Sequence, residues 1–226
     1  MANIFIISAP SGSGKSTLVR ALRETVSNLE FSISYTTRRP RGTEQNGREY
    51  YFVTREEFEA MVRRQEFLEH AEVFGNYYGT ARRFLESAEE KAYDLLLDID
   101  VQGAEQIKRK LPAAQSIFIL PPNRGELERR LRERSQDSEA VIQRRLEAAA
   151  REIENYWKYD YILVNDRLPK SVKDLQAILL AERQKRQEQT DRNLIARAEM
   201  CRLDRMREKL HPILESFQRT AAGGGK

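Results

Sequence analysis

The sequence predicts an α/β fold, with helices packed on both faces of a parallel sheet. One observation is a set of short apolar runs with the length and composition of buried strands, at residues 3–8, 94–98, 115–120 and 161–164. A second is that stretches of helical length separate these runs. Strands that alternate with helices are typical of a parallel sheet covered on both faces.

The predicted helices lie between these strands. We expect them at about 16–27, 101–109, 124–134 and 139–159, with another from about residue 170. In the first of them, Leu18, Leu22 and Val26 form one apolar stripe, which is the pattern of a helix that covers a core. Pro121 and Pro122 end the strand at 115–120, because proline cannot donate to a strand ladder.

A segment in the first half of the chain interrupts this alternation. Its strands look short and mixed, and Arg, Tyr and Gly are frequent in it. Thr54, followed three residues later by Glu57, forms a capping box that predicts the start of a helix. We therefore predict a small inserted domain at 34–83, within a core made of 1–33 and 84–185.

The last part of the chain, 186–226, is predicted to be a charged helical extension. Residues 182–226 hold 11 Lys/Arg and 7 Asp/Glu, and this difference equals the whole formal net charge of +4. A stripe with 3-4-3-4 spacing runs through Leu203, Met206, Leu210, Ile213 and Phe217. Pro212 is expected to kink or break this helix. The stripe could dock on the body or on a partner chain, so a homo-oligomer through this helix stays open.

The composition argues against several classes of protein. The chain has 226 residues, 40% of them hydrophobic and 33% charged, and neither percentage indicates a disordered chain or a membrane protein. The N-terminus lacks the basic start and cleavage site of a signal peptide, so we expect a cytoplasmic protein. Cys201 is the sole cysteine, and His70 and His211 have no cysteine cluster for a zinc site. Since the basic excess belongs to the tail, nucleic acid is not an expected partner.

The strongest motif is a phosphate-binding loop, or P-loop, between the first strand and the first helix. We expect ATP phosphates to bind Ala9, Pro10, Ser11, Gly12, Ser13, Gly14, Lys15, Ser16 and Thr17. Gly12 and Gly14 let backbone N–H groups approach a polyphosphate, and the helix that follows offers its positive end. Lys15 supplies a mobile cation, and the Ser16 hydroxyl can bind Mg²⁺. The usual pattern opens with Gly, and here that position is Ala9.

Two acids lie at the carboxyl end of the strand at 94–98. Asp98 and Asp100 lie where a carboxylate can hold Mg²⁺ directly or through water. For Asp100, a simple helix cap is the alternative. The chain contains no guanine-reading N-K-x-D motif of a GTPase, because the nearest sequence is V-N-D-R at 164–167.

Arginines and tyrosines could bind a second phosphate. Arg38 and Arg41 flank Pro40, and a guanidinium binds phosphate with two parallel hydrogen bonds, although a solvated basic loop fits these two residues equally well. Tyr50 and Tyr78 could add phenol donors. Mobile arginines on a lid at about 122–145 could neutralise a transferring phosphoryl group, but spacing alone does not choose among them.

Together these motifs resemble the guanylate kinases of the P-loop nucleoside monophosphate kinase family, bacterial type. The resemblance covers about 3–186 and rests on the order and spacing of A-P-S-G-S-G-K-S-T, S-Y-T-T-R-R-P-R, N-G-R-E-Y-Y-F-V, F-L-E-H-A, G-N-Y-Y-G-T, L-L-L-D-I-D-V-Q-G, R-L-R-E-R and I-Q-R-R-L. It implies a P-loop NTPase-type core, an inserted GMP-binding domain and a helical lid. It also implies transfer of the γ-phosphate of ATP to GMP, with Mg²⁺ as cofactor and dGMP as a related acceptor.

The resemblance further implies roles for individual residues. Those implied to face guanine are Ser34, Glu69, Thr80 and Asp98. Those implied to hold the GMP phosphate are Arg38, Arg41, Tyr50 and Tyr78. Those implied to act in catalysis are Lys15, Arg38, Arg134 and Arg145. Asn165 would lie near adenine. Ser16 and Asp100 would hold Mg²⁺, directly or through water. Arg167 and Pro169 stand where the family usually has acids, and the tail is longer than expected.

Two other functions remain open at this point. The chain could phosphorylate another small phosphorylated acceptor, such as a ribose bisphosphate, but a sugar needs no guanine reader such as Glu69. It could be a binding module of the same fold that has lost catalysis and recognises a phosphopeptide. The intact Gly12, Gly14, Lys15 and Ser16 argue against that second alternative.

Overall fold

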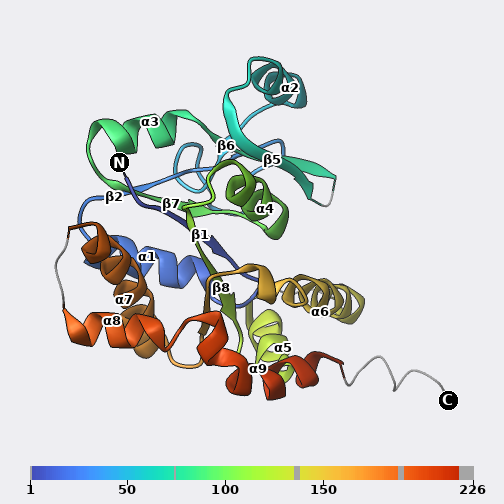
Figure 1. The fold of residues 1–226 in the computed structure, drawn as a ribbon. Helices are drawn as coiled ribbons and strands as arrows, with labels where there is room; N and C mark the ends of the chain where they lie inside the picture. The colour runs from blue at the N-terminus through green and yellow to red at the C-terminus, as the bar shows by residue number, and fades with distance from the viewer. Residues whose placement is uncertain (1, 74, 135–137, 188–190, 219–226) are drawn as a thin grey trace. The chain divides into compact units, whose positions relative to one another are not determined.

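The computed structural model describes residues 2–73, 75–134, 138–187 and 191–218 (Figure 1). The chain forms two compact units, each made of two segments. The first unit is Met1–Ile7 with Asn28–Gln115, and the second is Ser8–Ser27 with Ser116–Lys226. The predicted division into a core, an inserted domain and an extension stays a prediction.

The first unit contains three parallel strands. Strand β7 (Asp94–Asp98) pairs in parallel with β1 (Ile4–Ser8) on one side and with β2 (Leu29–Phe31) on the other. The central residues of β1 and β7 are fully buried, as expected for parallel strands that read as unbroken apolar runs. Helix α3 (Arg83–Glu90) packs against β2 and β7, and α4 (Val101–Lys110) follows β7 directly.

The same unit contains a mixed sheet in the order β4-β3-β6-β5. Its strands are β3 (Tyr35–Thr36), β4 (Tyr51–Phe52), β5 (Phe67–Val73) and β6 (Asn76–Ala81), and only β3 and β4 pair in parallel. Helix α2 (Arg55–Arg63) begins at the predicted capping box. Thr54 Oγ1 accepts from the Glu57 N–H at 3.1 Å, and the Glu57 carboxylate accepts from the Thr54 N–H at 2.8 Å. This sequence signal is confirmed.

The second unit contains the parallel pair of strands β8 (Gln115–Leu120) and β9 (Tyr161–Val164). The boundary between the units falls after the first residue of β8, so Gln115 is counted in the first unit. Its helices up to the extension are α1 (Lys15–Thr25), α5 (Arg124–Arg134), α6 (Glu139–Ile153) and α7 (Leu168–Gln187). Helix α6 ends earlier than expected, and a short 3₁₀ turn, Tyr156–Lys158, follows it. Helix α1 packs on α7, and α7 packs on β9.

The C-terminal extension packs on its own unit. It forms α8 (Arg192–Glu199), which lies on α7, and α9 (Leu203–Gln218), which contacts α5, α6 and β9. The predicted stripe is largely buried, through Met206, Leu210, Ile213 and Phe217. Docking on the body, one of the two alternatives, is therefore observed, while a homo-oligomer through this segment stays a hypothesis.

Helix α9 continues through Pro212, so of the two predicted effects of this proline, a kink or a break, the break does not occur. Proline removes one backbone donor from the helix, but the buried stripe on both sides of it keeps the helix in place. The extension also forms hydrogen bonds with the backbone of β9 and of Asp160, the residue before it. The Ile162 N–H donates to the Cys201 carbonyl at 2.7 Å, and the Leu203 N–H donates to the Asp160 carbonyl at 3.2 Å.

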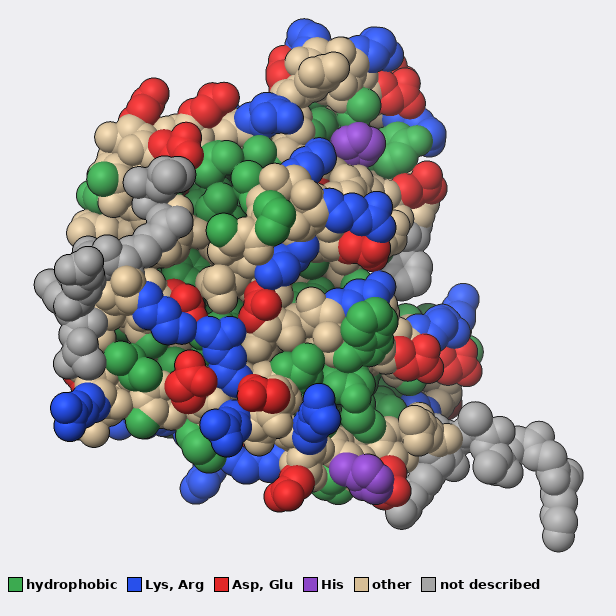
Figure 2. Space-filling model, viewed as in Figure 1, with side chains coloured by type: hydrophobic (Ala, Val, Ile, Leu, Met, Phe, Trp, Pro, Cys, Tyr) green, Lys and Arg blue, Asp and Glu red, His purple; other side chains and the backbone are tan. Residues whose placement is uncertain are grey.

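The expected α/β fold, with parallel strands flanked by helices, is confirmed by these pairings. Within the described residues, no helix has both the length and the apolar character needed to cross a membrane. On the face drawn in Figure 2, Lys and Arg side chains lie interspersed with Asp and Glu.

Candidate active site

The P-loop of the second unit connects the end of β1 with the start of α1. Gly12 has φ +90° and Gly14 has φ +88°, and both values lie in the left-handed region that side chains rarely adopt. A Cβ at Gly12 would lie 2.9 Å from side-chain atoms of Leu127 and Leu131, and one at Gly14 would overlap Nδ2 of Asn165. Both glycines are therefore required by conformation and by space.

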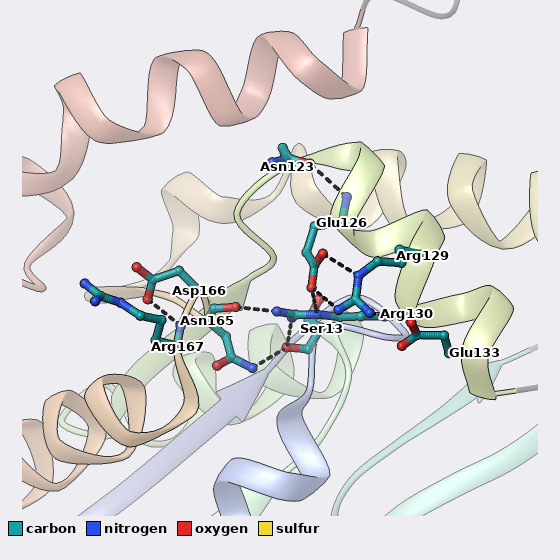
Figure 3. A network of polar contacts seen from close by, with 9 residues as sticks. All are labelled: Ser13, Asn123, Glu126, Arg129, Arg130, Glu133, Asn165, Asp166 and Arg167. Atoms are coloured by element: carbon teal, nitrogen blue, oxygen red, sulfur yellow. Dashed lines mark hydrogen bonds and ion pairs between the residues drawn. The ribbon is translucent and has the colours of Figure 1, made fainter.

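A network of polar side chains forms hydrogen bonds with the backbone of this loop at Ser13 (Figure 3). The buried Asn165 side chain donates from Nδ2 to the Ser13 carbonyl at 2.8 Å. Arg130, on α5, donates to the same carbonyl at 3.4 Å and to the Asn165 carbonyl at 2.9 Å. Arg130 also donates from Nε to Glu126 at 2.8 Å. One arginine thus joins the P-loop, helix α5 and the end of β9.

Glu126 is the anion that holds Arg130 in this network. Hydrogen bonds from Arg129 and then Arg130 lower the pKa of the Glu126 carboxyl to about 2, so it is ionised at neutral pH. Sequence reasoning missed Arg130 and Glu126, because α5 carries many arginines and acids at similar spacing. What distinguishes Arg130 from the other arginines of α5 is the hydrogen bond from its side chain to the Ser13 carbonyl of the P-loop.

The other residues predicted on the ATP side are Arg145, Arg134 and Asn165. Arg145, on α6, donates to Ser11 Oγ of the P-loop at 2.9 Å. Arg134 is the last residue of α5, and its side chain lies outside the described part of the chain, as do residues 135–137 of the predicted lid. The amide nitrogen of Asn165 is engaged with the loop. Its predicted place near adenine stays a proposal.

Glu69 and Thr80 form a buried pair in the first unit. They lie opposite each other on β5 and β6, and Thr80 Oγ1 donates to Glu69 Oε1 at 2.6 Å. Burial raises the pKa of the Glu69 carboxyl to about 7; the hydrogen bond from Thr80 opposes this rise, and the nearby charge of Asp100 adds to it. A buried carboxyl that changes charge near neutral pH is a candidate for a functional group.

The two predicted acids have different places. Asp98 is the half-buried last residue of β7. Asp100 is the N-cap of α4, and its Oδ1 accepts from the Gly103 N–H at 2.8 Å. The alternative interpretation of Asp100, that it caps a helix, is therefore observed. A role in binding metal stays a proposal. Among the described residues, no group of three or more His, Cys, Asp or Glu gathers as a metal site.

Arg38 lies at the centre of an aromatic and acidic cluster. It is 8% exposed, and its guanidinium binds Glu44 with two contacts, NH1 to Oε2 at 2.9 Å and NH2 to Oε1 at 3.0 Å. It also lies over the Tyr50 ring, 5.2 Å from its centroid, and the Tyr50 and Tyr78 rings meet edge to face at 5.9 Å. Sequence reasoning missed Glu44, which presents to Arg38 the same pair of anionic oxygens that a phosphate would.

Two further predicted residues are tied to this region through their backbone. Arg41 is exposed, and its N–H donates to the Glu44 carboxylate at 2.8 Å. Ser34 is half-buried, and its carbonyl accepts from the Tyr51 N–H at 2.9 Å. The structure thus brings Arg38 together with the two tyrosines, and Glu69 together with Thr80.

Comparisons with known proteins point to one family. The family model described as guanylate kinase matches residues 1–182. The chain is 57% identical over 222 residues to a guanylate kinase of Koribacter versatilis, covering 95% of both chains. It is 50% identical over 192 residues to that of Escherichia coli K12, covering 84% of this chain and 93% of the relative. A crystal structure of guanylate kinase from Anaplasma phagocytophilum aligns with a TM-score of 0.67 at 39% identity, covering 80% of this chain and 86% of that one.

Proposed function

Because the chain belongs to the guanylate kinase family, we propose that it transfers the γ-phosphate of ATP to GMP, giving ADP and GDP. The observation that carries this proposal is the P-loop, with its two left-handed glycines directly before α1. Backbone N–H groups that point inward and the positive end of a helix form a site for a polyphosphate. We assign the ATP phosphates to residues 9–17 and adenine to the side of Asn165.

We assign the acceptor base to Glu69, Thr80, Ser34 and Asp98, of which Glu69 and Thr80 are hydrogen-bonded to each other. Guanine offers two donors, the N1–H and the 2-amino group, and an ionised carboxylate can accept both. Adenine presents an acceptor at N1, which would face the carboxylate without a hydrogen bond. A site that leaves buried polar groups unpaired rejects such an analogue by large factors. Among acceptors with this base, dGMP keeps the same edge as GMP.

The acceptor phosphate is assigned to Arg38, Arg41, Tyr50 and Tyr78. Glu44 now binds the Arg38 guanidinium with both oxygens, so phosphate must displace this carboxylate or share the guanidinium with it. Before the substrate arrives, Glu44 already holds Arg38 in the orientation that a phosphate needs. This is because a carboxylate and a phosphate bind a guanidinium with the same geometry.

Phosphoryl transfer needs alignment and charge neutralisation rather than a covalent intermediate with the protein. An oxygen of the GMP phosphate attacks the γ-phosphorus in line, and Lys15, Arg38, Arg134 and Arg145 balance the negative charge of the transferring group. Ser16 and Asp100 supply a hydroxyl and a carboxylate oxygen, the ligand types that Mg²⁺ prefers, and Mg²⁺ would neutralise the ATP phosphates when bound. We place the reaction in the cytoplasm, where ATP and GMP are available.

A coupled ADP-release assay tests the proposed function. It would use the full chain with ATP, Mg²⁺ and each of GMP, dGMP, AMP, CMP and UMP. Rapid ADP release with GMP and little with AMP is the expected result. No release with any nucleotide would contradict the proposal, and sugar phosphates and phosphopeptides would then be tested. These alternatives are not favoured by the family or by the intact P-loop.

Arg130→Met should remove hydrogen bonds that fix the conformation of the P-loop, and so weaken ATP binding. No residue assigned to bind phosphate is removed by this change. Loss of a charge-assisted hydrogen bond costs about 1.5–3 kcal/mol, so we expect the KM for ATP to rise about tenfold or more. The KM for GMP should stay within about twofold, because the contacts of Arg130 are with the P-loop, Asn165 and Glu126. Initial rates with each substrate varied in turn measure both constants.

Arg129→Met is the matched control for this change. Arg129 lies one residue earlier on α5 and binds Glu126 and Glu133, on an exposed face of the helix. It should leave both KM values close to those of the unchanged chain. Equal effects of the two variants would show that α5 needs its arginines for stability only, and the assigned role of Arg130 would be rejected.

The KM for GMP should rise as the pH falls below 7. The free Glu69 carboxyl has a pKa of about 7, and guanine needs its ionised form as acceptor. Above pH ~8 the group is ionised and the KM should be constant, whereas each unit below pH ~7 should raise the KM by up to about tenfold.

Initial rates between about pH 6 and about pH 8.5 measure this dependence. Glu69→Gln is the control, because it retains the shape of the side chain but cannot titrate. Any slope that remains in this variant comes from GMP itself, whose phosphate titrates near pH ~6 as phosphate monoesters do. Identical slopes in both proteins would refute the assignment of the pH dependence to Glu69.

A further inference from the structure

Gly103 lies in the first turn of α4, where glycine is a poor choice. Only proline is less favourable inside a helix, because glycine loses the most backbone freedom on folding. The left-handed conformation that requires glycine at Gly12 and Gly14 does not occur at Gly103, which has ordinary helical backbone. The backbone therefore gives no reason for glycine, and the reason must lie in what surrounds the missing side chain.

The space beside Gly103 is taken by the Glu69 carboxylate. A Cβ at this position would lie 2.5 Å from Glu69 Oε2, 3.0 Å from Glu69 Cδ and 3.4 Å from Asp100 Oδ1. A separation of 2.5 Å between a carbon and an oxygen is far inside van der Waals contact. Any side chain at Gly103 must therefore move Glu69 or move helix α4.

Glu69 has little freedom to move. It is 4% exposed, and Thr80 holds its other oxygen, Oε1, through a buried hydrogen bond of 2.6 Å. A carboxyl group is planar, so a shift of Oε2 also turns Oε1 away from Thr80. The clash at Gly103 would thus change the direction of both oxygens.

Helix α4 cannot withdraw easily either, because three of its side chains bind the backbone of β5. Gln106 donates to the His70 carbonyl at 2.7 Å and accepts from the His70 N–H at 3.3 Å. Lys110 donates to the Leu68 carbonyl at 2.5 Å, and Gln102 donates to the Glu72 carbonyl at 3.5 Å. These contacts fix α4 to the strand on both sides of Glu69.

We propose that Gly103 determines base specificity by leaving the space in which the Glu69 carboxylate adopts its guanine-reading orientation. This inference rests on the proposed function, in which Glu69 accepts the two guanine donors. Gly103 touches no substrate in this proposal and acts through Glu69 alone. It is a positioning residue, and its effect should appear in the acceptor constants rather than in those for ATP.

Gly103→Ala is the test, with GMP, IMP and AMP as acceptors. IMP keeps the N1–H of guanine but lacks the 2-amino group, so the ratio of kcat/KM for GMP to that for IMP reports how well both carboxylate oxygens are aimed. We expect the KM for GMP to rise at least tenfold and the GMP-to-IMP ratio to fall at least fivefold. The KM for ATP should change less than twofold.

Gly125→Ala is the matched control. Gly125 also lies in the first turn of a helix, α5, and there an added Cβ would meet only Asn123 Oδ1, at 3.4 Å. This variant should keep the constants for GMP and IMP. Thermal melting of both variants separates loss of folding from loss of specificity, because a merely structural glycine would lower Tm without changing the GMP-to-IMP ratio.

A second change should partly restore the function lost in Gly103→Ala. Glu69→Asp shortens the acid by one methylene group and withdraws the carboxylate from the new Cβ. The double variant should have a higher kcat/KM for GMP than the product of the two single effects predicts, which is positive coupling. Strictly multiplicative effects, or an unchanged GMP-to-IMP ratio in Gly103→Ala, would overturn the inference. If the unchanged chain does not phosphorylate GMP, the proposed function fails first.

Discussion

Lys15→Ala is expected to lower kcat by about 10³-fold or more. Preorganised charges at a transferring phosphoryl group contribute effects of this size. Lys15 is the first residue of α1, directly after the left-handed Gly14, so its backbone position should persist in the variant. The KM for GMP should change little, because the acceptor is assigned to other residues.

Coupled ADP release at saturating ATP and GMP measures this effect, and thermal melting checks the fold. Lys91→Ala is a suitable control. Lys91 is half-exposed and pairs with Glu30 at 2.9 Å on the first unit, and neither residue is assigned to a substrate. Turnover in Lys15→Ala within tenfold of the unchanged chain would refute the assignment of the P-loop as the site of transfer.

Glu69→Ala is expected to lower kcat/KM for GMP by about 10³-fold and to remove most of the preference for GMP over AMP. The variant loses the acceptor of both guanine donors, and unpaired polar groups in a buried site are what separate such substrates. Activity with AMP should stay the same or rise, since no carboxylate then faces the adenine N1. The ratio of kcat/KM for GMP to that for AMP is the quantity to measure.

The control for this change lies on the same strand. Glu72 is an exposed acid three residues along β5, and Glu72→Ala should retain the preference for GMP. Since Glu69→Ala also leaves Thr80 without its acceptor, some loss of stability is expected, and the assay should be run well below the measured Tm. A preference that survives in Glu69→Ala would remove Glu69 from the base pocket.

Much of the secondary structure could be predicted because its causes are local. The capping box at Thr54 and Glu57 acts within four residues, and the apolar runs of β1, β7, β8 and β9 report burial on both faces. The two P-loop glycines could also be recognised in sequence, since the left-handed conformation there demands them. The course of α9 through Pro212 could not be predicted, because contacts with α5, α6 and β9 outweigh the lost backbone donor.

The contacts around the site could be predicted only in part. Motifs identified Glu69 and Thr80, but the buried hydrogen bond between them depends on how β5 pairs with β6. Arg130 has the same local pattern as its neighbours on α5, and only the folded chain brings it to the Ser13 carbonyl. Gly103 reads in sequence as an unfavourable residue in a helix, and its reason lies more than thirty residues away, in Glu69.

The backbone contacts between the extension and β9 have a practical consequence for anyone who shortens this chain. The family match ends at residue 182, which invites truncated versions for expression. Removal of residues 201–203 would expose the Ile162 N–H and the Asp160 carbonyl, and loss of α9 would uncover apolar surface on α5 and α6. An exposed strand edge beside apolar surface is a template for pairing with a second copy. Poor solubility of a truncated form would then report aggregation, and it should not be read as evidence about catalysis or natural assembly.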